Sequence, residues 1–156
     1  CKHTILCVGG GISIDRRYRM EEWKNYCVKH RIHSNTEDKF SKNFYWSDEA
    51  PVYNDEMLTL INQKFAIDTV ITHTAPDFCE QINKNGLHSF AASDENLLKD
   101  VEDERTTMTK LYDRLVYDAH PLTHWYYGHF HQSWHSSIEG VLFKMLDIME
   151  FTPINY

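Results

Sequence analysis

The chain has 156 residues, about the length of one ordinary domain, and 42% of them are hydrophobic, 25% charged and 13% aromatic. With only six Gly and four Pro, this composition excludes collagen-like, low-complexity and largely disordered proteins. The net charge of −7, without a continuous basic block, makes nucleic acid an unexpected partner. No apolar stretch reaches the roughly 18 to 20 residues of a membrane-spanning helix, and the four cysteines form no C-x-x-C pair. We therefore expect a cytoplasmic protein without disulfides and without a membrane partner.

The first element expected is a buried strand over residues 4–8, where apolar and β-branched residues lead into three glycines at positions 9–11. No G-K-[ST] follows the glycines and no helix is expected to open there, so we interpret them as a site of close backbone packing. Ile12 and Ile14 flank Ser13 in strand-like alternation, which predicts that the chain continues extended over residues 12–19. Residues 20–44 are polar without a clear period, and we expect a surface insertion that is partly helical over residues 21–29.

A helix is expected from Asn54 or Asp55, either of which can cap it, to about Phe65. The β-branched run at residues 68–72 then predicts a strand that leads directly into His73.

The longest helix is expected over residues 94–118, ended by Pro121. Its apolar residues recur at three- and four-residue intervals: Leu97, Leu98, Val101, Met108, Leu111, Leu115 and Val116. Its acidic residues are expected to form a solvated face: Asp100, Glu102, Asp103, Glu104 and Asp113.

Residues 123–127 predict a strand that is stopped by Gly128, where the backbone can turn. A tight turn over residues 138–141 then joins a short strand to one over residues 141–148. This alternation of strands and helices predicts a layered α/β domain with functional residues at the strand ends.

Three histidines stand at such ends. His129 and His131 are two residues apart, and on an extended segment their side chains would point the same way, about 7 Å apart, as two ligands of adjacent metal ions require. A surface histidine pair is the alternative interpretation. His73 follows another strand and completes a set of three imidazoles, which suits Mn, Fe or Zn better than Mg or Ca.

Four segments in this order resemble the C-terminal half of the calcineurin-like metallophosphoesterase family. They are Val8-Gly9-Gly10-Gly11-Ile12-Ser13-Ile14-Asp15, Tyr45-Trp46-Ser47-Asp48-Glu49, Val70-Ile71-Thr72-His73-Thr74-Ala75-Pro76 and Tyr127-Gly128-His129-Phe130-His131. The last two are the specific ones. The resemblance covers most of the chain, so we expect residues 1–156 to form one partial domain with an insertion at 20–44.

This resemblance implies a four-layer αββα sandwich and hydrolysis of phosphate esters by two divalent metal ions. It implies that His73 and His129 bind one metal and His131 the other. The bridging carboxylate, the remaining ligands and the acid histidine would precede Cys1. We therefore expect no catalytic acid in this chain, and we expect the rest of a longer parent chain to complete the site.

Two arginines, Arg16 and Arg19, are candidates to bind a substrate phosphate, with ion pairing to neighbouring acids as the alternative. His120 and His124 have H-x-x-x-H spacing, but Pro121 between them prevents the helix that a metal site would need. Aromatic residues could line a substrate pocket or anchor loops: Trp23, Tyr26, Phe40, Phe44, Tyr45 and Trp46.

The expected function is metal-dependent phosphoester hydrolysis. Two alternatives remain at this point. One is a non-catalytic scaffold of the same family that acts through surface contacts, against which the three retained histidines argue. The other is a free-standing histidine-rich module that binds metal tightly.

Overall fold

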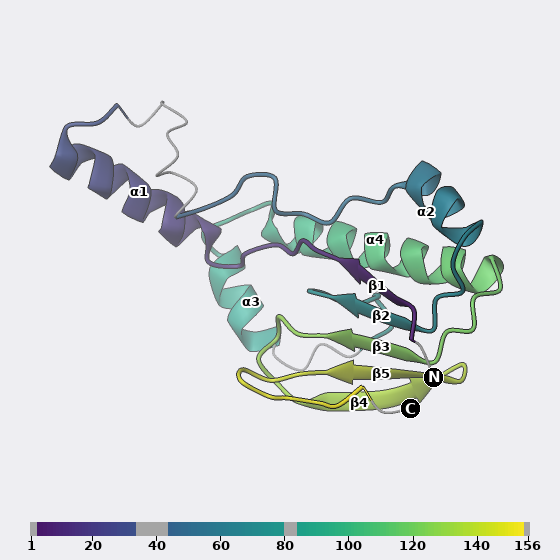
Figure 1. Ribbon diagram of the computed structural model, residues 1–156. Coiled ribbons are helices and arrows are strands. Elements are labelled where there is room, and N and C mark those ends of the chain that lie inside the picture. The colour runs from purple at the N-terminus through teal and green to yellow at the C-terminus, as the bar shows by residue number, and fades with distance from the viewer. Residues whose placement is uncertain (1–2, 34–43, 80–83, 155–156) are drawn as a thin grey trace.

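A five-stranded mixed β-sheet organises the part of the chain that the computed structural model describes, residues 3–33, 44–79 and 84–154 (Figure 1). Its strands lie in the order β1 (Ile5–Val8), β2 (Thr69–Thr72), β3 (His124–Tyr127), β5 (Val141–Met145) and β4 (Trp134–Ile138). The first four are parallel, and β4 is an antiparallel edge strand. The expected strands and the α/β class are confirmed.

Helices α2 (Asp55–Asn62) and α4 (Leu97–Tyr117) lie over one face of this sheet (Figure 1). They bury alternate residues of the strands in a common core with their own apolar sides. Trp125 and Phe143, both 0% exposed, stack at a centroid distance of 5.7 Å in its centre. Helix α2 begins at the expected cap, because the Asn54 side chain accepts the Met57 backbone N–H at 2.9 Å.

Helix α4 differs from expectation in which of its residues are buried. Glu104 is only 2% exposed, so the prediction of a fully solvated acidic face is wrong for this residue. Counted from Val101 and Met108, Glu104 falls at the helical spacing of the buried side. Leu98 and Val116, which the pattern placed among the apolar positions, are exposed.

Helix α1 (Arg16–His30) contradicts the expected extended chain over residues 12–19. Its first residue, Arg16, is held by ion pairs with Asp94 at 2.5 Å and Asp100 at 2.7 Å. Because both partners are far along the chain, the local sequence pattern could not reveal this start. The helix projects away from the sheet (Figure 1), and it includes the expected helical part of the insertion. Residues 34–43, with Phe40, lie outside the described residues.

Helix α3 (Lys84–Ala91), which the sequence pattern did not predict, lies near the carboxyl ends of the parallel strands (Figure 1). Leu87 and Ala91 of α3 pack against a second small core made by Ile12, Leu97 and Val101. This contact covers one side of the region where the loops after β1, β2 and β3 meet.

None of the helices in the described ranges combines the length and the apolar character needed to cross a bilayer. Among the described cysteines, Cys27 and Cys79 are buried and Cys7 is exposed.

Candidate functional site

The loops that follow β1, β2 and β3 meet at one edge of the sheet, because these neighbouring strands are parallel. The loop after β1 carries the glycines at 9–11, the loop after β2 begins with His73, and the loop after β3 carries His129 and His131. Residues from distant parts of the chain therefore share the edge at which α/β proteins usually bind ligands.

His73 and His129 face each other across this edge. His73 Nε2 lies 2.8 Å from His129 Nδ1, and the two rings meet edge to face with centroids 4.6 Å apart. The backbone of Ile12 also interacts with the His129 ring and acts to raise its pKa. Two imidazole nitrogens bound to one cation at about 2.1 Å would be about 3 Å apart. The observed pair is therefore close to the spacing that a shared metal ion needs.

Both rings favour the neutral form, because the pKa of each is lowered. Burial is the main cause that lowers the pKa of His129, to about 4, and the neighbouring His73 and His131 lower it further. Burial also lowers the pKa of His73, against the opposing effect of the Glu49 carboxylate. A neutral imidazole has a free lone pair, which is the form that binds metals.

His131 lines the same cavity as the other two histidines and interacts electrostatically with both. The segment that carries His129 and His131 does not have the extended conformation that their spacing predicted. His129 and His131 have positive φ angles of 70° and 52°, and the Phe130 N–H bonds to the Gly128 carbonyl at 2.9 Å. The turn is therefore made by the histidines themselves rather than by Gly128. Non-glycine residues held in this conformation are enriched at functional sites.

The glycine loop packs directly against this pair, as expected. A Cβ atom at Gly11 would overlap Cδ2 of His73. Gly10 has a φ of +100°, and a Cβ there would lie 2.7 Å from the backbone nitrogen of Pro51. These two positions need glycine for close approach and, at Gly10, for its backbone conformation.

Glu49 fixes the same loop from its outer side. Its carboxylate accepts the Ser13 backbone N–H at 2.6 Å and the Ser13 hydroxyl at 2.7 Å, and its backbone carbonyl accepts the Gly11 N–H at 2.8 Å. The sequence pattern did not reveal this role of Glu49. Its only signal was its place in the second segment of the family resemblance.

Two hollows adjoin the histidine pair. A cavity of about 570 Å³ is lined by all three histidines together with Ser13, Arg19 and Phe130. A more open one, of about 620 Å³, reaches His73 from the side of Arg19 and Glu49. It is lined also by three of the aromatic residues considered above: Phe44, Tyr45 and Trp46. Trp23 and Tyr26 instead pack against Phe44.

The two candidate arginines differ in position. Nε and Nη2 of Arg16 are engaged by Asp94 and Asp100, so this residue anchors α1. Arg19 pairs with Asp15 at 2.8 Å, but it remains 46% exposed and lines both hollows. The geometry therefore favours Arg19 over Arg16 as a contact for a substrate.

The other histidine pair has structural contacts. His120 Nδ1 accepts the Ile67 backbone N–H at 3.1 Å, and His124 Nδ1 lies 2.8 Å from the Thr123 hydroxyl. These contacts give both histidines a structural role.

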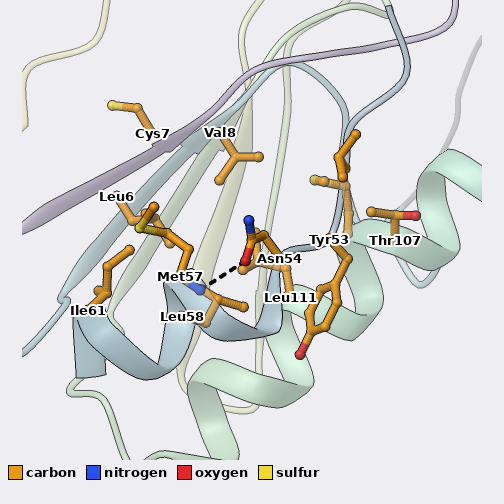
Figure 2. Close-up of a pocket in the computed structure, with 12 residues that line it drawn as sticks. Leu6, Cys7, Val8, Tyr53, Asn54, Met57, Leu58, Ile61, Thr107 and Leu111 are labelled. Carbon is orange, nitrogen blue, oxygen red and sulfur yellow. Dashed lines mark hydrogen bonds between the residues drawn. The ribbon is translucent and has the colours of Figure 1, made fainter. Parts of the chain in front are cut away.

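Figure 2 shows a different cavity, of about 220 Å³, between β1, α2 and α4. Its lining is mostly apolar, and no His, Asp or Glu among the described residues contributes to it. The Asn54 amide oxygen in its wall is already occupied by the Met57 N–H (Figure 2). The cavities that are lined by histidine and charged side chains are therefore those at the strand ends.

In the described ranges, no group of three or more His, Cys, Asp and Glu side chains is arranged to hold a metal ion. The structure brings two of the three expected ligands, His73 and His129, into direct contact and leaves His131 on the wall of the same cavity. Imidazole donors of this kind suit a transition metal, so the residues present fit part of a metal site.

No protein-family model, curated protein or solved structure matches this chain.

Replacing Gly11 by alanine is expected to displace the His73 ring, because the new methyl group would occupy the position of its Cδ2. The imidazole can rotate away, so we expect loss of the His73–His129 hydrogen bond with little change in overall stability. Ring-nitrogen NMR signals of the two histidines measure this. Gly9→Ala is the matched control, since nothing lies within 4 Å of a Cβ there. An unchanged His73 signal in Gly11→Ala would contradict the close packing.

Proposed function

We propose that this chain is the C-terminal part of a metal-dependent phosphoester hydrolase of the calcineurin-like type. The observation that carries the proposal is the contact between His73 and His129 at the carboxyl ends of β2 and β3, in a cavity that also exposes His131 and Arg19. A bound pair of Mn, Fe or Zn ions would neutralise the phosphate oxygens and activate the attacking water.

In this proposal, His73, His129 and His131 hold the metal ions and Arg19 orients the substrate. Its guanidinium can donate to two phosphate oxygens at once if it leaves Asp15, and the exposed Asp15–Arg19 pair is weak enough to allow that. The lowered pKa values of both imidazoles favour the neutral form, so metal binding requires only that the proton shared by His73 Nε2 and His129 Nδ1 moves to another ring nitrogen.

The proposal also includes the finer fold, in which this sheet is one of two in a four-layer sandwich. Leu6 and Val8 of β1 pack against the core under the helices, whereas Ile5 and Cys7, which alternate with them, are exposed. A second sheet on that opposite face would cover the exposed side chains. The bridging carboxylate, the remaining ligands and the acid histidine are assigned to residues outside this sequence, because three imidazoles cannot supply them.

The test compares the 156-residue chain with a longer protein that includes the residues encoded before Cys1. Each is assayed with Mn²⁺ against p-nitrophenyl phosphate and bis-p-nitrophenyl phosphate. We expect metal-dependent turnover by the longer protein and none above buffer by the short chain, whose ligand set is incomplete.

Three results would contradict parts of this proposal. Turnover by the short chain alone, lost in His131→Ala, would show that its site is complete. No turnover by the longer protein with Mn²⁺, Fe²⁺ or Zn²⁺ would refute phosphoester hydrolysis of these substrates and favour the non-catalytic scaffold. Tight metal binding by the short chain without turnover in either form would favour the metal-binding module.

A further inference from the structure

A buried carboxylate on α4 links the loops that carry the histidine pair. Glu104 Oε2 accepts the backbone N–H of Ile12 at 2.6 Å, and Glu104 Oε1 accepts the Thr74 hydroxyl at 3.1 Å. Ile12 lies in the loop after β1, and Thr74 directly follows His73 in the loop after β2. One side chain therefore connects two loops that come from adjacent strands.

The same loop reaches the third strand. The backbone of Ile12 also interacts with the His129 ring, so Ile12 connects Glu104 on one side with His129 on the other. Gly11, one residue earlier, packs on the His73 ring. Both imidazoles thus rest on the segment whose position Glu104 holds.

The burial of Glu104 argues against an incidental contact. An ionisable side chain that is 2% exposed costs folding free energy unless its polar atoms are used, and both of its oxygens are used here. The next residue, Arg105, holds the rest of the loop after β2 in a similar way. It is 7% exposed and donates hydrogen bonds to the backbone carbonyls of Pro76, Asp77 and Cys79. Glu104 and Arg105, which are consecutive residues of α4, therefore hold the loop that follows His73.

We propose that Glu104 is a positioning residue for the His73–His129 pair, acting through the Ile12 N–H and the Thr74 hydroxyl. It sets the separation and tilt of the two rings and does not itself touch a metal or substrate. Partners of this kind around metal-binding histidines typically change metal affinity by about 10- to 100-fold when they are removed. The inference deepens the proposed function and rests on it for its metal-binding part.

The first measurement needs no metal. Ring-nitrogen NMR of the metal-free 156-residue chain reports the hydrogen-bonded state of each histidine. In Glu104→Leu, which offers no acceptor to Ile12, we expect the His73 and His129 signals to lose their mutual hydrogen bond. Glu104→Gln retains a carbonyl acceptor for the Ile12 N–H and is expected to keep the wild-type signals. Glu102→Gln, at an exposed position of the same helix, is the control.

The second measurement is a Co²⁺ titration, followed by visible absorption, of the longer protein, because the ligand set of the 156-residue chain is incomplete. We expect Glu104→Leu to bind Co²⁺ about 10- to 100-fold more weakly than wild type, and Glu104→Gln and Glu102→Gln to bind as wild type does. If Glu104→Leu does not fold, as judged by circular dichroism, Thr74→Val tests the same linkage. It removes only the hydroxyl contact, so a displaced His73 signal is expected and an unchanged one overturns the inference.

The two proposals fail in different ways. If the longer wild-type protein does not bind Co²⁺, the proposed metal site is wrong, while the NMR comparison still tests Glu104. If wild type binds Co²⁺ and a folded Glu104→Leu keeps both its affinity and its histidine signals, the positioning role alone is overturned.

Discussion

Replacing His129 by asparagine is expected to lower the affinity of the longer protein for Mn²⁺ or Zn²⁺, and its phosphoesterase turnover, by at least about 100-fold. Loss of an outer partner already costs about 10- to 100-fold, and a direct ligand contributes more. Asparagine is chosen because His129 has a φ of 70°, a conformation that asparagine tolerates better than alanine does. The substitution therefore removes the imidazole at little cost to the backbone.

His73→Ala should have an equally large effect, because its Nε2 is the atom that faces His129 Nδ1. His135→Asn is the matched control, since His135 is exposed on β4 and lies outside the cavity of the histidine pair. His120→Ala should also leave turnover nearly unchanged, although it removes the acceptor of the Ile67 N–H. Metal affinity by calorimetry and turnover of p-nitrophenyl phosphate are the measurements. Wild-type turnover in His129→Asn would show that His129 does not belong to the catalytic site.

Glu104 should make the metal-free chain less stable as the pH rises. Burial raises the pKa of Glu104 to about 7 from a model-peptide value of 4.5, an effect that Arg105 opposes and Glu49 strengthens. Because the folded state binds this proton more tightly than the unfolded state, the stabilising contribution is complete below about pH 4.5. It is lost as the pH passes through 7. The expected loss is about 3 kcal/mol.

Glu104→Gln should remove this dependence, because glutamine carries no ionisable proton in this pH range. Urea unfolding at pH 4.5 and 8.5, in the presence of a chelator, measures both proteins. We expect the variant to gain about 3 kcal/mol of unfolding free energy relative to wild type between these two values. Contributions from other groups, such as the lowered pKa of His129, cancel in this difference. An equal pH dependence of wild type and Glu104→Gln would contradict the burial of an ionisable Glu104, and Glu102→Gln should behave as wild type.

Local patterns predicted most of the regular structure correctly. The β-branched runs of β1, β2 and β3 and the cap at Asn54 act over a few neighbouring residues, so the sequence alone reveals them. The strand order and the layers could be expected only as a class, because parallel pairing joins strands that are far apart in the chain.

The candidate site was predicted in part. His73, His129 and His131 were chosen because each follows a strand, and parallel strands bring such positions to one edge. Their geometry differed from the expectation, since the left-handed turn at His129 and His131 replaced the extended segment on which the spacing argument rested. From the sequence, Glu104 was assigned to a solvated face because its charge was given more weight than its helical spacing from Val101 and Met108.

The sequence therefore sufficed for those features whose causes lie within a few residues: the strands, the cap of α2 and the positions of the three histidines at strand ends. The start of α1 and the burial of Glu104 instead depend on contacts between residues that are far apart in the chain. Arg16 begins a helix because Asp94 and Asp100 hold it. Glu104 is buried because the Ile12 N–H, 92 residues earlier, and the Thr74 hydroxyl, 30 residues earlier, use its two oxygens. A buried charge is tolerated only where such partners satisfy it, and only the folded chain brings these partners together.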